Sequence, residues 1–183
     1  MDTEEIKEKI EHSPNRRVAL LIAVLALGLA FFESLGKSYQ TDALSLQVES
    51  ANLWSFYQAK SIKAHATELA RGIVIEVSDK DQLSESEALK KWAEDVERLT
   101  SNDADKDGKQ QLFEKAKEIE AERNLMFKKY RYMEIASAIL QVSIVLASAA
   151  IITSAGFLVT GACILGVVAT AVGLVGLFVP ALI

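Results

Sequence analysis

One acidic segment has the residue types and the spacing of a calcium-binding loop. The pattern D-x-D-x-D-G-x5-E is matched by Asp103, Asp105, Asp107, Gly108 and Glu114. Carboxylate oxygens at these positions would surround a hard cation, and the backbone carbonyl of Lys109 would add one more ligand. Gln110 stands where an aliphatic residue normally pairs with a second loop, and the sequence has no second loop. Two interpretations stay open: a Ca²⁺ site, and a solvated acidic turn that caps a helix starting near Lys109. We favour the second.

The rest of the sequence has no pattern typical of an enzyme. His12 and His65 have no cysteine or histidine partner at ligand spacing, which argues against a zinc site. No nucleophile elbow is present among the many serines. The formal net charge of −5, without a basic stripe, argues against nucleic acid as a partner. We therefore predict a protein that is not an enzyme and that has no cofactor apart from the Ca²⁺ hypothesis.

A long apolar stretch indicates the elements that must position these residues. Residues 135–183 contain no charged side chain, and a membrane-spanning helix needs roughly 20 mostly apolar residues. We place two spans at residues 133–155 and 157–179, and an apolar run at residues 18–35 gives a third. A signal peptide is the alternative for this run, but the acidic leader of seventeen residues argues against it. The predicted fold class is an all-α integral membrane protein with one N-terminal transmembrane helix and a C-terminal hairpin.

The charged segments complete this organisation. Residues 1–17 form an N-terminal charged segment, and residues 36–132 form a soluble, coiled-coil-like helical hairpin or bundle. Four basic residues precede the first span: Lys7, Lys9, Arg16 and Arg17. They predict a cytoplasmic N-terminus and, in a bacterium, a periplasmic middle domain on a multi-pass inner-membrane protein. A second basic cluster before the second span favours the opposite orientation: Arg123, Lys128, Lys129 and Arg131. We follow the first helix, which usually dominates.

Apolar and small residues recur at steps of three and four along the first soluble helix. This 44–73 stripe consists of Leu44, Val48, Ala51, Ser55, Ala59, Ile62, Ala66, Leu69 and Ile73. Its period predicts a helix packed along another helix. A second helix has a stripe of Leu89, Trp92, Val96 and Leu99, and a third has Leu112, Ala116, Ile119, Met126, Tyr130 and Met133. Since one short hairpin does not bury such long stripes alone, we predict a homo-oligomer.

Small residues also line the C-terminal hairpin. In the second span they are Ser143, Ala147, Ala150 and Ser154, and in the third they are Ala162, Gly166, Ala169, Gly173 and Gly176. Small residues let helix backbones approach closely in lipid. We expect helices of one chain to pack together here, in preference to a dimerisation face.

A cluster of aromatic and amide side chains lies within the first soluble helix. We predict packing or interaction roles for Trp54, Tyr57, Gln58, Lys60 and Ser61, with Gln58 and Ser61 hydrogen-bonding between helices. The segment 52–65, with TDALSLQ at 41–47, KAKEIEAER at 115–123 and the C-terminal hairpin, resembles a bacterial family catalogued as domain of unknown function four-three-three-seven. The resemblance covers nearly the whole chain. It implies inner-membrane proteins with one N-terminal span, a helical middle and a C-terminal pair of spans, and it implies no activity.

These observations predict a non-enzymatic helical scaffold, anchored in the lipid bilayer, that self-associates or binds an unidentified protein partner. One alternative is a calcium-responsive membrane module that uses the acidic loop. The other is an oligomeric pore whose path is lined by Gln141, Ser143 and Thr170.

Overall fold

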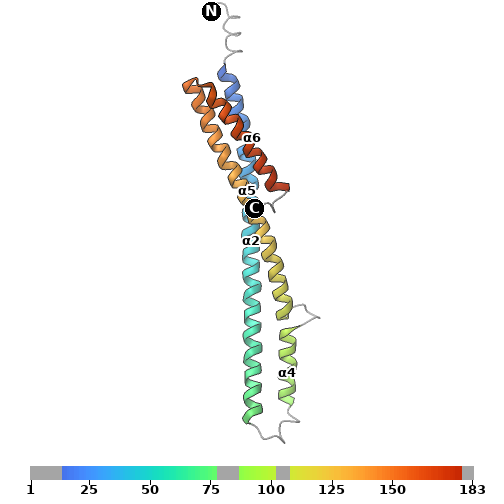
Figure 1. Cartoon of the computed structure of the whole chain (residues 1–183). Coiled ribbons are helices and arrows are strands. Elements are labelled where there is room, and N and C mark those ends of the chain that lie inside the picture. Colours follow the sequence, from blue (N-terminus) through green and yellow to red (C-terminus); the bar gives the residue numbers. More distant parts are fainter. Residues whose placement is uncertain (1–13, 78–86, 102–107, 179–183) are drawn as a thin grey trace, which may run out of the picture. The chain divides into compact units, whose positions relative to one another are not determined.

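The computed structural model describes residues 14–77, 87–101 and 108–178, and these residues form four α-helices (Figure 1). The helices are α2 (Pro14–Val77), α4 (Glu87–Thr100), α5 (Lys109–Thr153) and α6 (Gly156–Phe178). The described ranges contain no strand. The chain divides into two compact units. The first contains Met1–Ala43 and Asn124–Ile183, the second contains Leu44–Arg123, and both α2 and α5 contribute to each unit.

Helices α2 and α5 confirm the prediction of long helices that continue beyond the apolar runs. Helix α2 begins at Pro14, a residue favoured in the first helical turn because its missing N–H would have no intrahelical acceptor there. It runs for 64 residues without interruption. Gly72 does not end α2, which continues to Val77. A single glycine costs a helix only about 1 kcal/mol, which the surrounding helix formers offset.

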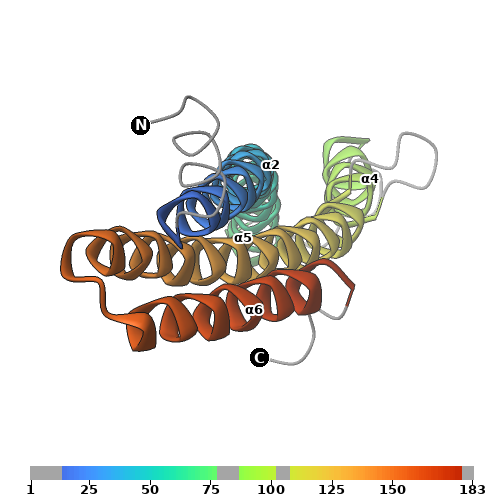
Figure 2. The same cartoon turned by 90° about the horizontal axis from the view of Figure 1, so that it is seen from above.

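The first unit contains the apolar parts of α2, α5 and α6. All three helices are long and apolar enough to cross a membrane. Helix α6 runs alongside α5 (Figures 1 and 2). The core combines residues from the three helices: Leu25, Phe32, Tyr132, Met133, Ala136, Leu140 and Ala169. Helix α5 ends at Thr153 and α6 covers Gly156–Phe178, and the limits of the last two spans stay a prediction.

The predicted small-residue seam of α6 is confirmed. All five of its positions are buried: Ala162, Gly166, Ala169, Gly173 and Gly176. A Cβ at Gly166 would lie 2.7 Å from the Leu25 side chain of α2, and one at Gly173 would overlap the Phe32 ring of α2. A Cβ at Gly176 would overlap a side chain of α5. The absent side chains therefore let α6 pack closely against both other helices of this unit.

The connection between α5 and α6 is tight. Ser154 has a φ of 55°, in the left-handed region that commonly ends an α-helix. The N–H of Leu158 donates to the carbonyl of Ala155 at 3.1 Å, in the first turn of α6. The left-handed residue reverses the chain direction within two residues, as the predicted hairpin requires.

The second unit contains residues 44–77 of α2, helix α4 and the first turns of α5. The predicted stripe of α4 faces inward, because Leu99 is buried and Leu89, Trp92 and Val96 are half-buried. In α5, Ala116 is buried and Ile119 is half-buried. Two of the three predicted stripes therefore pack within the chain, and the third, on α2, does not.

Candidate functional site

The 44–73 stripe lies on the surface of α2. All nine of its residues are exposed. The five large side chains keep much of their area in water: Leu44 53%, Val48 61%, Ile62 70%, Leu69 67% and Ile73 54%. We had expected this stripe to pack along another helix, and within one chain that expectation is wrong.

A different face of α2 packs inside the second unit. Ser50 and Ala64 are buried and Tyr57 is half-buried, at intervals of seven residues. A second set with the same interval is also half-buried: Leu46, Leu53, Lys60 and Thr67. Steps of three and four that repeat every seven residues are typical of a helix that packs along a neighbour. Sequence reasoning missed this seam because Ser50, Lys60 and Thr67 interrupt it with polar side chains. The strict seven-residue spacing of these positions was the signal from which the inward face of α2 could have been predicted.

The two faces of α2 point in nearly opposite directions. Residues two positions apart on an α-helix are separated by about 200°. Ala64 faces inward, and its neighbours Ile62 and Ala66, two positions away on either side, face outward. The eight steps of the 44–73 stripe average about 3.6 residues, the period of a straight helix, so the stripe does not wind around α2. None of its nine residues is charged. It is therefore a straight, uncharged and solvent-exposed apolar strip.

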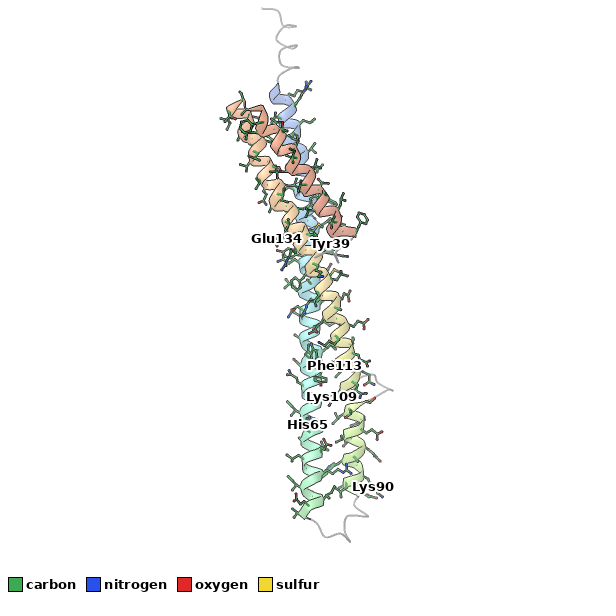
Figure 3. The ribbon with its side chains drawn as sticks, viewed as in Figure 1. Tyr39, His65, Lys90, Lys109, Phe113 and Glu134 are labelled. Atoms are coloured by element: carbon green, nitrogen blue, oxygen red, sulfur yellow. The ribbon has the colours of Figure 1, made fainter. Side chains whose placement is uncertain are left out.

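An aromatic cluster joins α2 to α5 within the second unit. The rings of Trp54 and Tyr57 lie 5.5 Å apart between centroids, and the Phe113 ring of α5 lies 5.6 Å and 5.9 Å from them (Figure 3). Trp54 Nε1 donates a hydrogen bond of 3.0 Å to Glu120 Oε1. Lys117 Nζ donates to Glu120 Oε2 at 3.2 Å and lies 5.4 Å from the centroid of the Trp54 ring. Both carboxylate oxygens of Glu120 thus accept a hydrogen bond, and the bond from Trp54 joins α2 to α5.

The electrostatics of this cluster favour the ionised carboxylate. The hydrogen bond from Trp54, followed by that from Lys117, lowers the pKa of Glu120 below its ordinary value of 4.5. Trp54 and Tyr57, for which we predicted packing roles, both contribute rings to this cluster. Phe113, Lys117 and Glu120 were not singled out from the sequence, where one aromatic residue among charged ones has no distinctive pattern.

The other predicted packing residues are more dispersed. Lys60 and Ser61 are half-buried, whereas Gln58 is exposed. The interhelical hydrogen bonds expected of Gln58 and Ser61 stay a prediction.

The acidic loop is only partly within the described residues. Asp103, Asp105 and Asp107 lie outside them. Lys109 is the first residue of α5, and the N–H of Leu112 donates to the carbonyl of Gly108 at 2.9 Å, which confirms a helix start at this point. Glu114 is exposed one turn later. The described residues contain no group of three or more potential metal ligands, and calcium binding stays a prediction.

The three side chains proposed to line a pore lie in different environments. Ser143 is fully buried and donates to the carbonyl of Ile139 at 2.8 Å. Gln141 is exposed and donates to Glu33 at 3.2 Å. Thr170 is exposed on α6 and donates to the carbonyl of Gly166 at 2.8 Å. A path lined by all three would need a rearrangement that exposes Ser143.

Together these features define a class of protein: an all-helical chain with three helices apolar enough to cross a membrane and a helix with a solvent-exposed apolar strip. The family model described as domain of unknown function (DUF4337) matches residues 14–179. The chain belongs to this family, as the resemblance in its sequence implied. No curated protein and no solved structure matches the chain.

Proposed function

We propose that this protein is a membrane-anchored scaffold that self-associates through the 44–73 stripe, with a second copy of the same chain as the partner. The observation that carries the proposal is the exposure of all nine stripe residues on a face that the described residues leave uncovered. Soluble surfaces rarely expose long contiguous apolar strips, and those that do are commonly interfaces.

The residues of the stripe suit pairing with an identical helix. Ala51, Ser55, Ala59 and Ala66 are small, so two backbones can approach closely at the centre of the stripe. Larger residues lie towards its two ends, with Leu44 and Val48 at one end and Leu69 and Ile73 at the other. In a two-fold symmetric pair each residue would face its own counterpart, and the uncharged stripe puts no like charges opposite each other.

Membrane anchoring sets the direction of the pairing. Copies that insert into one bilayer in the same orientation have α2 helices that run in the same direction. The assembly is therefore a parallel one, in which apolar contacts between spans add to those of the stripe. The basic residues before the first span favour a cytoplasmic N-terminus, with the second unit in the periplasm of a bacterial host.

The direct test is the assembled mass of the full-length protein in detergent. In the variant with Ala59→Arg and Ala66→Arg, two charged side chains would lie in the uncharged stripe, and we expect the mass to fall to that of one chain. Both positions are exposed, so the substitutions leave the fold of one chain intact.

A matched control carries the same two substitutions elsewhere. Ala88 and Ala121 are exposed on α4 and α5, outside the stripe, and Ala88→Arg with Ala121→Arg should keep the wild-type mass. A monomeric wild-type protein, or equal dissociation by both double variants, would refute self-association through the stripe.

A further inference from the structure

A polar groove of about 480 Å³ lies between α2 and α5 in the first unit. Helix α2 contributes Glu33 and Lys37, which are one turn apart, and α5 contributes Glu134, Ser137 and Gln141 on successive turns. The two helices approach closely here, because a Cβ at the buried Gly36 would lie 3.2 Å from the Met133 Cβ. Figure 3 labels Glu134 of α5 at the level of Tyr39 of α2.

The groove contains hydrogen-bond acceptors from both helices. Gln141 Nε2 donates to Glu33 Oε1 at 3.2 Å, which leaves the amide oxygen of Gln141 able to accept. Tyr130, before the second predicted span, lines the groove with Glu134. Burial, and then the negative charge of Glu134, raises the pKa of Tyr130, so this phenol keeps its proton.

Ser137 points to a missing hydrogen-bond partner. Its side chain lines the groove, and the residue is only 7% exposed. Among the residues that the structure describes, its hydroxyl has no hydrogen-bond partner. Buried polar groups in folded proteins are nearly always paired, so a group that enters the groove would satisfy Ser137.

The two carboxylates have a related requirement. Glu33 and Glu134 lie at the edges of the first and second predicted spans, where an uncompensated charge is costly. Within the described part of the chain neither has an ion pair. Lys37, on the next turn of α2 from Glu33, supplies a positive charge at about 6 Å along the helix axis. The groove therefore presents two negative groups and one positive group, a net negative charge that favours a cation.

We propose that the groove binds the headgroup of phosphatidylethanolamine. Its primary ammonium has three N–H donors, which suit the Glu33 and Glu134 carboxylates and the Ser137 hydroxyl. Together with Lys37, this ammonium would balance the charges of the two carboxylates. Phosphatidylcholine has a quaternary ammonium without N–H donors, and phosphatidylglycerol has no cation, so both should bind less well. The inference rests on the membrane embedding in the proposed function and is independent of self-association.

The test is native mass spectrometry of the full-length protein, released from nanodiscs that contain the three lipids in equal amounts. Wild type should retain phosphatidylethanolamine about tenfold better than either other lipid. The variant with Glu33→Gln and Glu134→Gln should lose that preference. A control with Glu118→Gln and Glu122→Gln changes the net charge equally at exposed sites of α5 and should keep it. Equal retention of all three lipids by wild type would overturn the proposal.

Two further variants separate this site from a structural role and from self-association. If the groove binds no ligand, Ser137→Ala removes an unpaired hydroxyl, so it should raise the melting temperature and leave the lipid preference unchanged. If the groove binds phosphatidylethanolamine, Ser137→Ala should lower the preference for this lipid severalfold. An unchanged preference would contradict the proposal. The monomeric Ala59→Arg, Ala66→Arg variant should keep the wild-type preference. Soluble glycerophosphoethanolamine, which has the same headgroup without acyl chains, should compete poorly with phosphatidylethanolamine for the groove. If it competes as well as the lipid does, the proposal that the ammonium belongs to a lipid is wrong.

Discussion

Ile62 offers the most quantitative test of the 44–73 stripe. It is 70% exposed, so an interface with a second copy would remove most of its side chain from water. Full burial of an aliphatic side chain contributes about 1.5–3 kcal/mol. Burial of the exposed seven tenths of the Ile62 side chain therefore contributes roughly 1–2 kcal/mol per copy, and twice that in a symmetric dimer. At about 1.4 kcal/mol for each factor of ten, Ile62→Ala should raise the dissociation constant by roughly 30- to 700-fold.

The substitution leaves the single chain intact. Ile62 is exposed on α2, and alanine has a higher helix propensity than isoleucine, so loss of assembly would not reflect unfolding. Sedimentation equilibrium in density-matched detergent gives the dissociation constant directly. Phe56→Ala is the matched control, because Phe56 is 61% exposed on the same helix but lies about 120° from Ile62. Equal weakening by both substitutions would refute a specific interface and indicate general apolar attraction.

Three predictions concern the contacts within one chain. Gly173→Ala should destabilise the first unit by about 1–3 kcal/mol, since the added Cβ would overlap a ring of α2. Gly161→Ala should not destabilise it, because a Cβ at Gly161 has no neighbour within 4 Å, and thermal unfolding compares the two variants. The contact between Trp54 and Glu120 contributes stability at pH values above 4.5, the ordinary carboxyl pKa, and this stability should be lost as the pH falls through the lowered pKa of Glu120 in the folded state. Tryptophan fluorescence should therefore change below pH 4.5, and Glu120→Gln should abolish that change. Ser154→Gly should raise the unfolding free energy by up to about 1 kcal/mol because glycine adopts its φ of 55° without strain, and a lower melting temperature would contradict this.

Periodicity predicted the helices and the small-residue seam of α6. Long runs without proline and with few glycines favour long helices, and α2 and α5 follow that expectation. Gly166, Gly173 and Gly176 leave gaps into which side chains of α2 and α5 fit, so their spacing identified the packed face of α6.

The inward face of α2 was not predictable from apolar spacing alone. Two stripes coexist on this helix, and the more apolar one is exposed, whereas the inward one contains Ser50, Lys60 and Thr67. Periodicity shows that a face can pack but not which partner covers it. The sequence identified only part of the aromatic cluster, because Trp54 and Tyr57 are three positions apart on one helix, whereas Phe113 belongs to another helix. The polar groove depends on pairs such as Glu33 and Gln141, which lie 108 positions apart in the sequence.

Disulfide cross-linking tests the central claim most directly, that two copies pair in parallel through the 44–73 stripe. Cys163 is the only cysteine of the chain, so a Cys163→Ser background accepts single cysteines at chosen positions. With a mild oxidant in membranes, Val48→Cys and Ala66→Cys should each give covalent dimers. Identical residues on either side of the middle of the stripe meet only in a parallel pair, within the Cα separation of about 4.4–6.8 Å that a disulfide needs. Glu68→Cys, exposed about 200° from Ala66, should give none. Absence of dimers at both stripe positions, or equal cross-linking at Glu68, would contradict the account.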